Sequence, residues 1–231
     1  MSIAENIARV RANIAAAARE AGREASEITL VGASKMNDAE ACRAAIAAGI
    51  DALGENREQE MTKKLAEHAY DGAPLHFIGH LQRNKVKNVV GKVALLESVG
   101  SLELLAAVDK QAEKLQIVQD ILLEVNIGGE EAKSGFAPEA LAQAAQEAKK
   151  CENVRVRGLM CIPPVAEGEH GSLPYFEKVH ALFVDINAKL YDNTLDILSM
   201  GMSGDYEDAV RAGATMVRVG TAIFGARNYT N

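Results

Sequence analysis

The chain has 231 residues, of which 48% are hydrophobic, and its formal net charge is −7. This length suits one α/β barrel, so we expect a single domain over residues 1–231 with one large core. The acidic balance, with a pI near 5.3, argues against nucleic acid or an anionic membrane as a partner, because both select clustered positive charge.

The first segment, residues 2–22, predicts an amphipathic helix and not a targeting peptide. Its apolar residues recur at helical spacing, and charged residues interrupt them: Ile3, Ile7, Val10 and Ile14. We find no run of the roughly 18 to 20 apolar residues that a membrane span needs. Three distant cysteines without a CxxC motif, Cys42, Cys151 and Cys161, favour reduced thiols in a cytoplasmic protein.

Eight short apolar or β-branched segments predict strands, at residues 29–33, 50–53, 75–78, 93–97, 120–126, 155–160, 195–200 and 215–219. Helical patterns lie between them, at residues 38–48, 55–68, 82–90, 101–114, 138–150, 174–190 and 204–212. Repeated alternation of this kind indicates a parallel sheet. Eight repeats favour a (β/α)₈ TIM barrel with an extra N-terminal helix. The first turn lacks a GxGxxG motif, which argues against a doubly wound open sheet.

In such a barrel the active site lies at the C-terminal ends of the strands. The residues predicted there are mostly glycine and small polar groups, with one lysine: Ser34-Lys35, Gly54-Glu55-Asn56, Gly79-His80, Ser98, Asn126, Met160-Cys161, Gly201-Met202-Ser203 and Gly220-Thr221. This composition predicts a pocket for a small ligand.

Two of these turns suit a phosphate group. Ser203 precedes the helix predicted at 204–212, and Gly220-Thr221 opens a short helical turn at 222–225. Barrels often bind phosphate in the loops after strands seven and eight, where backbone N–H groups and the helix dipole attract an anion. Ser203 as an N-cap and the glycines as turn residues remain the alternative.

Two cations are the other candidates. Arg218 lies between Val217 and Val219 in the last predicted strand, so we expect it to point into the barrel, where it needs a partner. An outward ion pair is the alternative. Lys35 at the barrel mouth suggests a carbonyl ligand held as a Schiff base, since partial burial favours the neutral amine. A surface lysine is the alternative, and spacing alone does not decide.

Five stretches carry a resemblance to a known family: LVGASK, LGENREQE, HFIGHLQRNK, RGLMCIPP and LSMGMSGDYEDAVRAGATMVRVGTAIFG. In this order they resemble the pyridoxal phosphate homeostasis protein family, also called the YggS/PROSC family. The similarity runs from the first strand to about Arg227. It implies a barrel like the alanine racemase N-terminal domain, with pyridoxal 5′-phosphate (PLP) bound as a Schiff base.

The resemblance also implies roles for individual residues. Lys35 would form the Schiff base, Ser203 and the Gly220-Thr221 backbone would hold the phosphate, and Arg218 would face the pyridine nitrogen. Asn56 would lie beside the ring, and His80 and Met200 would line the pocket. Two rim positions depart from the family, which commonly has threonine at Met36 and an aromatic residue at Arg57.

The resemblance further implies a binding protein and not an enzyme. PLP enzymes of this fold have a second, β-rich domain and complete their site as dimers, whereas this sequence stops at Asn231 soon after the eighth strand. An arginine at the pyridine nitrogen can only donate, which leaves PLP a weaker electron sink. We therefore expect a cytoplasmic monomer that stores, buffers or delivers PLP, with PLP-dependent apoenzymes as candidate recipients.

Two alternatives stay open, a minimal racemase-like PLP enzyme and a barrel aldolase or isomerase that uses Lys35 without PLP. The basic run at residues 83–87 is either a solvated helix face or a docking surface for client enzymes. His76 lies in a predicted strand and His80 just after it, so they do not share one helix face. No third ligand has a spacing suited to a metal, so no metal site is predicted.

Overall fold

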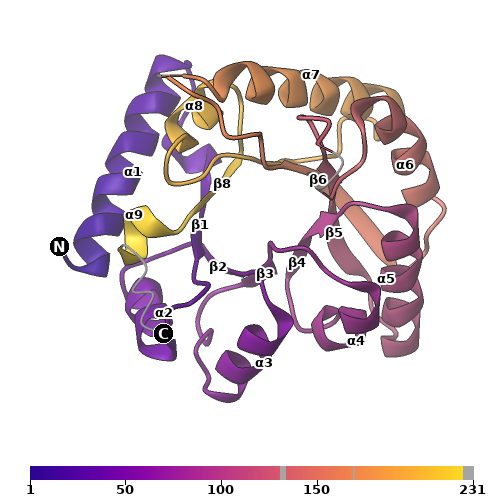
Figure 1. Cartoon of the computed structure of the whole chain (residues 1–231), viewed down its shortest axis with the longest axis horizontal. Helices are drawn as coiled ribbons and strands as arrows, with labels where there is room; N and C mark the ends of the chain where they lie inside the picture. Colours follow the sequence, from indigo (N-terminus) through magenta and orange to yellow (C-terminus); the bar gives the residue numbers. More distant parts are fainter. Residues whose placement is uncertain (131–133, 169, 226–231) are drawn as a thin grey trace.

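Eight parallel strands close into a barrel in chain order, with β1 paired to both β2 and β8 (Figure 1). The computed structural model describes residues 1–130, 134–168 and 170–225, so Arg227 lies outside the described residues. The strands are β1 Thr29–Ala33, β2 Ala52–Glu55, β3 Leu75–Phe77, β4 Leu95–Val99, β5 Gln119–Val125, β6 Val154–Cys161, β7 Ile197–Ser199 and β8 Met216–Val219. The predicted (β/α)₈ barrel is confirmed.

Helices surround this barrel as an outer ring (Figure 1). They are α1 Ile3–Glu20, α2 Ala39–Ala47, α3 Glu58–Ala66, α4 Val86–Val89, α5 Leu102–Leu115, α6 Leu141–Ala148, α7 Leu173–Leu190, α8 Tyr206–Arg211 and α9 Thr221–Phe224. Short 3₁₀ turns occur at η1 Ala25–Glu27, η2 Arg83–Lys85 and η3 Pro138–Ala140. In the part of the chain described, no helix has the length and apolar character needed to cross a membrane.

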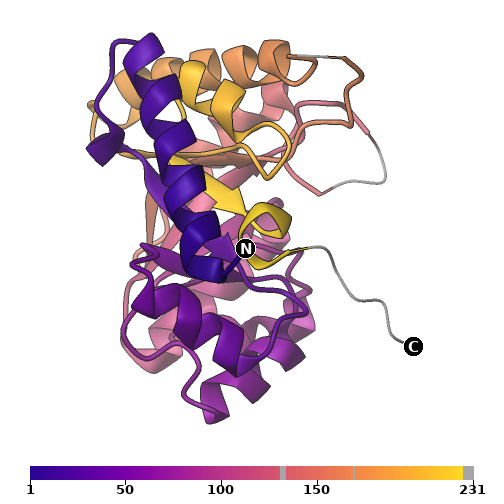
Figure 2. The same cartoon turned by 90° about the vertical axis from the view of Figure 1, so that its left-hand side faces the viewer.

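The N-terminal helix α1 packs against α2, α8 and α9 and so covers the part of the ring beside the short α9 (Figures 1 and 2). It starts at a capping box in which Ser2 and Glu5 satisfy each other's backbone N–H groups. Its buried face includes Ile7, and the Asn6 side chain donates a 2.8 Å hydrogen bond to the Ile223 carbonyl of α9. The first and last helices are thus joined.

Alternation along the strands sorts the core into two layers. The barrel interior holds a small apolar cluster of Val31, Ala52, Leu95, Leu122, Met160 and Met216. A much larger cluster fills the space between the strands and the helices, and Val217 and Val219 belong to it. Arg218 therefore points inward, as predicted, and it is only 3% exposed.

The observed boundaries differ from the predicted ones mainly at the mouth of the barrel. Strand β2 continues through Glu55, and α3 begins only at Glu58. The helix expected at 82–90 divides into η2 and α4, and α8 begins at Tyr206. Each of these boundary differences lengthens the loop that follows a strand. These loops form the mouth of the barrel, where a site would lie. Cys42, Cys151 and Cys161 are free thiols.

Candidate functional site

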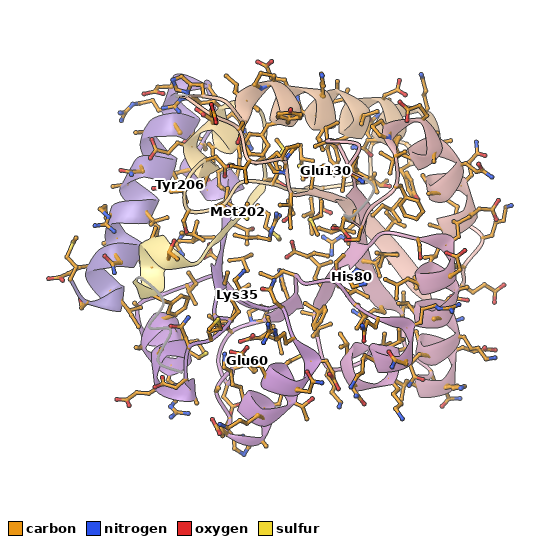
Figure 3. The ribbon with its side chains drawn as sticks, in the orientation of Figure 1. Lys35, Glu60, His80, Glu130, Met202 and Tyr206 are labelled. Atoms are coloured by element: carbon orange, nitrogen blue, oxygen red, sulfur yellow. The ribbon has the colours of Figure 1, made fainter. Side chains whose placement is uncertain are left out.

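The carboxyl ends of all eight strands meet at one rim, because the barrel is closed and parallel. Lys35 follows β1 at this rim and is half-buried. Figure 3 shows Lys35, His80 and Met202 around the barrel opening, each after a different strand. The structure thus brings residues that lie far apart in the sequence to one end of the fold.

The loops after β7 and β8 meet through the hydroxyl group of Ser203. Its Oγ accepts hydrogen bonds from the backbone N–H of Gly220 at 3.1 Å and of Ala222 at 3.3 Å. These N–H groups open α9, so Ser203 satisfies donors that a helix start leaves unpaired. We call Ser203, Gly220, Thr221 and Ala222 the α9 cradle.

The α9 cradle is next to the strand that carries Lys35. A Cβ at Gly220 would stand 3.4 Å from the carbonyl oxygen of Ala33, two residues before the lysine. The Thr221 side chain is exposed. The N–H groups of the α9 cradle and Lys35 therefore follow two neighbouring strands, β8 and β1, at the same rim.

A chain of polar side chains crosses the barrel interior below this rim. Arg218 donates from Nη1 to Ser199 Oγ at 2.6 Å, and Ser199 donates to Glu97 Oε2 at 2.6 Å. Arg218 also donates to the Cys161 carbonyl at 2.8 Å and lies 3.9 Å from Glu97. On its other side Glu97 is hydrogen-bonded to His76 Nδ1 at 2.8 Å.

This interior chain balances the charge of the guanidinium. Burial alone would raise the pKa of Glu97, but His76, Arg218 and Ser199 together hold that pKa below its ordinary value. Glu97 is therefore an anion, and it keeps Arg218 in place as a cation. An arginine held in this way presents only donors to whatever lies above it.

Three buried side-chain oxygens have no hydrogen-bond partner among the described residues: Asn56 Oδ1 and Glu124 Oε2 near the mouth, and Glu55 Oε2 behind the barrel wall. Glu124 accepts at its other oxygen from Ser134 Oγ at 3.0 Å, and burial raises its pKa. Buried polar atoms are nearly always paired in folded proteins. Such atoms at a barrel mouth are typical of a site built to meet a ligand.

His80 is exposed and lies between two cavities. One, of about 810 Å³, is lined also by Ser98, Ser101 and Ser134. The other, of about 200 Å³, contains Asn56. His80 is thus at the rim, as expected.

Met200 requires a correction. Its side chain is fully buried in the outer cluster between strands and helices. Strand alternation explains this position, since Ser199 takes the inward direction at the end of β7 and the next side chain points outward. Met200 therefore offers no surface to a ligand at the mouth.

The sequence reasoning did not find the partners of Arg218. His76 and Ser199 each stand between apolar residues, and Glu97 follows Leu95-Leu96 in β4, so the alternation that placed Arg218 inward applies to all three. It placed Glu55 among the residues at the mouth, but it did not predict the 2.6 Å ion pair that Glu55 of β2 forms with Lys64 of α3. No sequence periodicity links those two residues.

Comparisons with known proteins agree with this geometry. The chain matches the family model described as alanine racemase, N-terminal domain, over residues 6–228. It is 43% identical over 229 residues to the pyridoxal phosphate homeostasis protein of Aquifex aeolicus, covering 99% of this chain and 100% of the relative. The protein of the same name from Pseudomonas aeruginosa is 42% identical over 231 residues, covering 99% and 97%.

Solved structures show the same similarity. PipY of Synechococcus elongatus without PLP is 32% identical, with a TM-score of 0.87 and coverage of 97% of this chain and 100% of that one. PipY with PLP bound is 30% identical with a TM-score of 0.84 and the same coverage. Alanine racemase of Clostridium difficile, at 18% identity, TM-score 0.75 and coverage of 88% and 56%, shares the fold.

Proposed function

The chain belongs to the pyridoxal phosphate homeostasis protein family, and from this premise we propose that it binds PLP and acts in intracellular PLP homeostasis. It would store, buffer or deliver the cofactor without strong catalytic activity of its own. The single observation that carries the proposal is the meeting of Ser203 with the amides of Gly220 and Ala222, one strand away from Lys35.

The residues at the rim fit the two ends of PLP. The α9 cradle suits the phosphate, because the Ser203 hydroxyl can donate to an anion while its oxygen accepts from the amides of Gly220 and Ala222, and because N–H groups at a helix start attract anions. Lys35 supplies the amine for the aldehyde. Asn56 would lie beside the ring, since its buried Oδ1 lacks a partner among the described residues. His80 would border the opening.

Arg218 supports binding in preference to catalysis. When bound, PLP supplies an aldehyde that condenses with amines and a pyridine ring that withdraws electrons. The Arg218 guanidinium, neutralised by Glu97 through Ser199, would donate to the pyridine nitrogen and oppose its protonation. A racemase-like activity would appear as exchange of the α-proton of an amino acid, and we expect none at enzyme-like rates.

We extend the proposal to the setting of the protein. Its free thiols fit a reducing compartment such as the cytoplasm. Three of the large exposed hydrophobic side chains, Met36, Val165 and Val184, come from three separate parts of the chain, which fits a monomer. PLP-dependent apoenzymes would be the recipients, and residues 1–231 would act as one PLP-binding domain.

Absorbance spectroscopy tests the proposal. Purified protein loaded with PLP should show a visible Schiff-base band that borohydride bleaches, and mass mapping should place the reduced label on Lys35. Lys35→Ala should lose the band and the label. Lys63→Ala is the matched control, because Lys63 is 78% exposed on α3 and should leave both unchanged. A band and an affinity that persist in Lys35→Ala would refute the assignment.

A further inference from the structure

A buried charged cluster lies outside the barrel wall, between β2 and α3. Lys64 of α3 donates to Glu55 Oε1 at 2.6 Å and to Glu60 Oε1 at 2.8 Å. Lys64 is 4% exposed, Glu55 is 0% exposed and Glu60 is 21% exposed. Ser34 Oγ and Tyr70 also donate to Glu55 Oε1, at 2.6 Å and 3.0 Å. We call Lys64, Glu55 and Glu60 the α3 cluster.

Lys64 is charged in this setting. Burial alone would lower its pKa, but the hydrogen bonds and charges of Glu55 and Glu60 outweigh burial and raise that pKa above its ordinary value. Replacing a buried ion pair by apolar residues often leaves stability unchanged or higher. Stability alone is thus a weak reason for burying Lys64. The backbone contacts of Lys64 indicate a second role.

The α3 cluster binds both peptide units that flank Lys35. Lys64 Nζ donates to the carbonyl oxygen of Ser34 at 2.8 Å, which belongs to the peptide before Lys35. The backbone N–H of Met36 donates to Glu60 Oε1 at 2.5 Å, and this N–H belongs to the peptide after Lys35. The backbone of Lys35 is therefore held on both sides of its Cα by one ion-paired group.

The backbone just after Lys35 is in an unfavourable conformation. Met36 has φ 63°, in the left-handed region that a residue with a long side chain rarely adopts. Such conformations persist only where surrounding contacts impose them, and they gather at functional sites. The Glu60 contact to the Met36 N–H is a contact of this kind.

We infer that Glu60 and Lys64 are positioning residues for Lys35, which fix its backbone so that its amine is presented at the barrel mouth. The inference rests on the proposed function, because it gives Lys35 the PLP aldehyde as its target. Neither residue touches the cofactor; both act through the Ser34–Lys35–Met36 backbone.

Glu60→Ala tests the inference with little risk to the fold, because Glu60 is partly exposed while Glu55 remains to pair with Lys64. In the protein without PLP, hydrogen exchange of the amides of residues 35–37 should become faster. The rate at which added PLP forms the band on Lys35 should fall on the order of tenfold, since small misplacements of a reacting group have large effects on rate.

Three further variants separate positioning from general destabilisation. Glu60→Gln keeps an oxygen for the Met36 N–H and should recover most of the rate. Lys64→Met, which releases the Ser34 carbonyl, should slow band formation as Glu60→Ala does. Lys63→Met, on the exposed neighbour, should leave the rate and the melting temperature unchanged.

Wild-type exchange and wild-type rates in Glu60→Ala would overturn the inference, and so would an equal loss of rate in Lys63→Met. Failure of the proposed function is distinguishable. In that case wild-type protein would not trap PLP on Lys35, while the exchange of residues 35–37 would still report whether the α3 cluster holds this backbone.

Discussion

Charged and polar side chains are solvent-accessible and paired at one end of the barrel, and buried at the other. At the end where the strands begin, Asp120 binds Arg155 at 2.6 Å and Arg157 at 2.9 Å, and Arg157 also pairs with Asp196. These arginines are 64% and 31% exposed. At the end where the strands finish, the charges of Arg218 and Glu97 are buried, and Asn56 Oδ1 has no partner among the described residues.

This difference links the first end of the barrel to stability and the second end to ligand binding. The first end forms a chain of ion pairs in contact with solvent, in which each charge meets an opposite one. The second end keeps charges and unpaired atoms where burial makes them costly. Among the described residues, these buried groups lie toward the rim where the strands end, which is the rim that barrel proteins generally use to bind a ligand. Three predictions test the contrast.

The largest effect should come from removing the buried arginine, Arg218, whereas removing Arg157 at the opposite end should cost far less. Arg218→Met should lower the free energy of unfolding by about 3 to 5 kcal/mol, because it leaves Glu97 buried without its cation. Arg157→Met should lower it by about 1 kcal/mol or less, because Arg157 and Asp196 are 31% and 54% exposed and Asp120 keeps its pair with Arg155. Denaturant unfolding measures both, and equal losses would contradict the contrast.

Effects of intermediate size are expected at two asparagines, where one replacement should change PLP affinity and the other should change stability. Asn56→Ala should weaken PLP binding by roughly tenfold, about 1.4 kcal/mol, and change the free energy of unfolding little, because its buried oxygen bonds to nothing described. Asn187→Ala is the matched control. It removes two 2.9 Å hydrogen bonds to Leu195 and should lower stability by about 1 to 2 kcal/mol at unchanged affinity.

Titration of the protein loaded and unloaded with PLP measures the affinities, and thermal or denaturant unfolding measures the stabilities. The prediction for Asn56 would be wrong if its replacement lowered stability as much as the replacement of Asn187 while leaving PLP binding intact.

The smallest effects should appear in the pH dependence of two carboxyl groups. Burial opposes the charge of Asp120, but Arg155 and Arg157 together lower its pKa, so its stabilisation is present above the ordinary value of 3.8 and is lost as the pH falls through the lowered pKa. Asp120→Asn should therefore be less stable than wild type at neutral pH, and the difference should vanish in acid.

Glu124 should behave in the opposite sense. Its pKa is raised by burial, so the folded state loses stability as the pH rises from the ordinary value of 4.5 through the raised pKa. Glu124→Gln should gain stability relative to wild type over that window. Unfolding curves at several pH values measure both variants, and a shared sign would show that the two ends do not differ in this way.

The fold could be predicted because its signals are local. Strand β1 was predicted at its observed bounds, since an apolar β-branched run ends at a polar turn. Strand β2 was placed two residues early, because Gly54 and Glu55 carry no sign of burial in the sequence. Glu55 is a strand residue because its backbone pairs with β3, and its buried carboxylate is balanced by Lys64, whose position depends on how α3 packs.

The candidate site could also be predicted only where its signals are local or follow from the barrel geometry. Ser203 and the Gly220-Thr221 turn could be placed together because barrel geometry fixes which loops are neighbours. The left-handed Met36 could not be foreseen, since nothing in its side chain favours that conformation. Its backbone N–H is held by Glu60 of α3, which lies 24 positions further along the chain.

One feature of the outer ring links the site to the order in which the chain is made. Asn6 in α1 holds the carbonyl of Ile223 in α9, a separation of 217 positions, and β1 pairs with β8. During synthesis α1 and β1 are made before their partners α9 and β8, so the barrel seam closes only after β8 has been added. A chain without residues 216–225 would lack both this partner of α1 and the amides of Gly220 and Ala222, so the proposed phosphate contacts depend on closure of the β1–β8 seam.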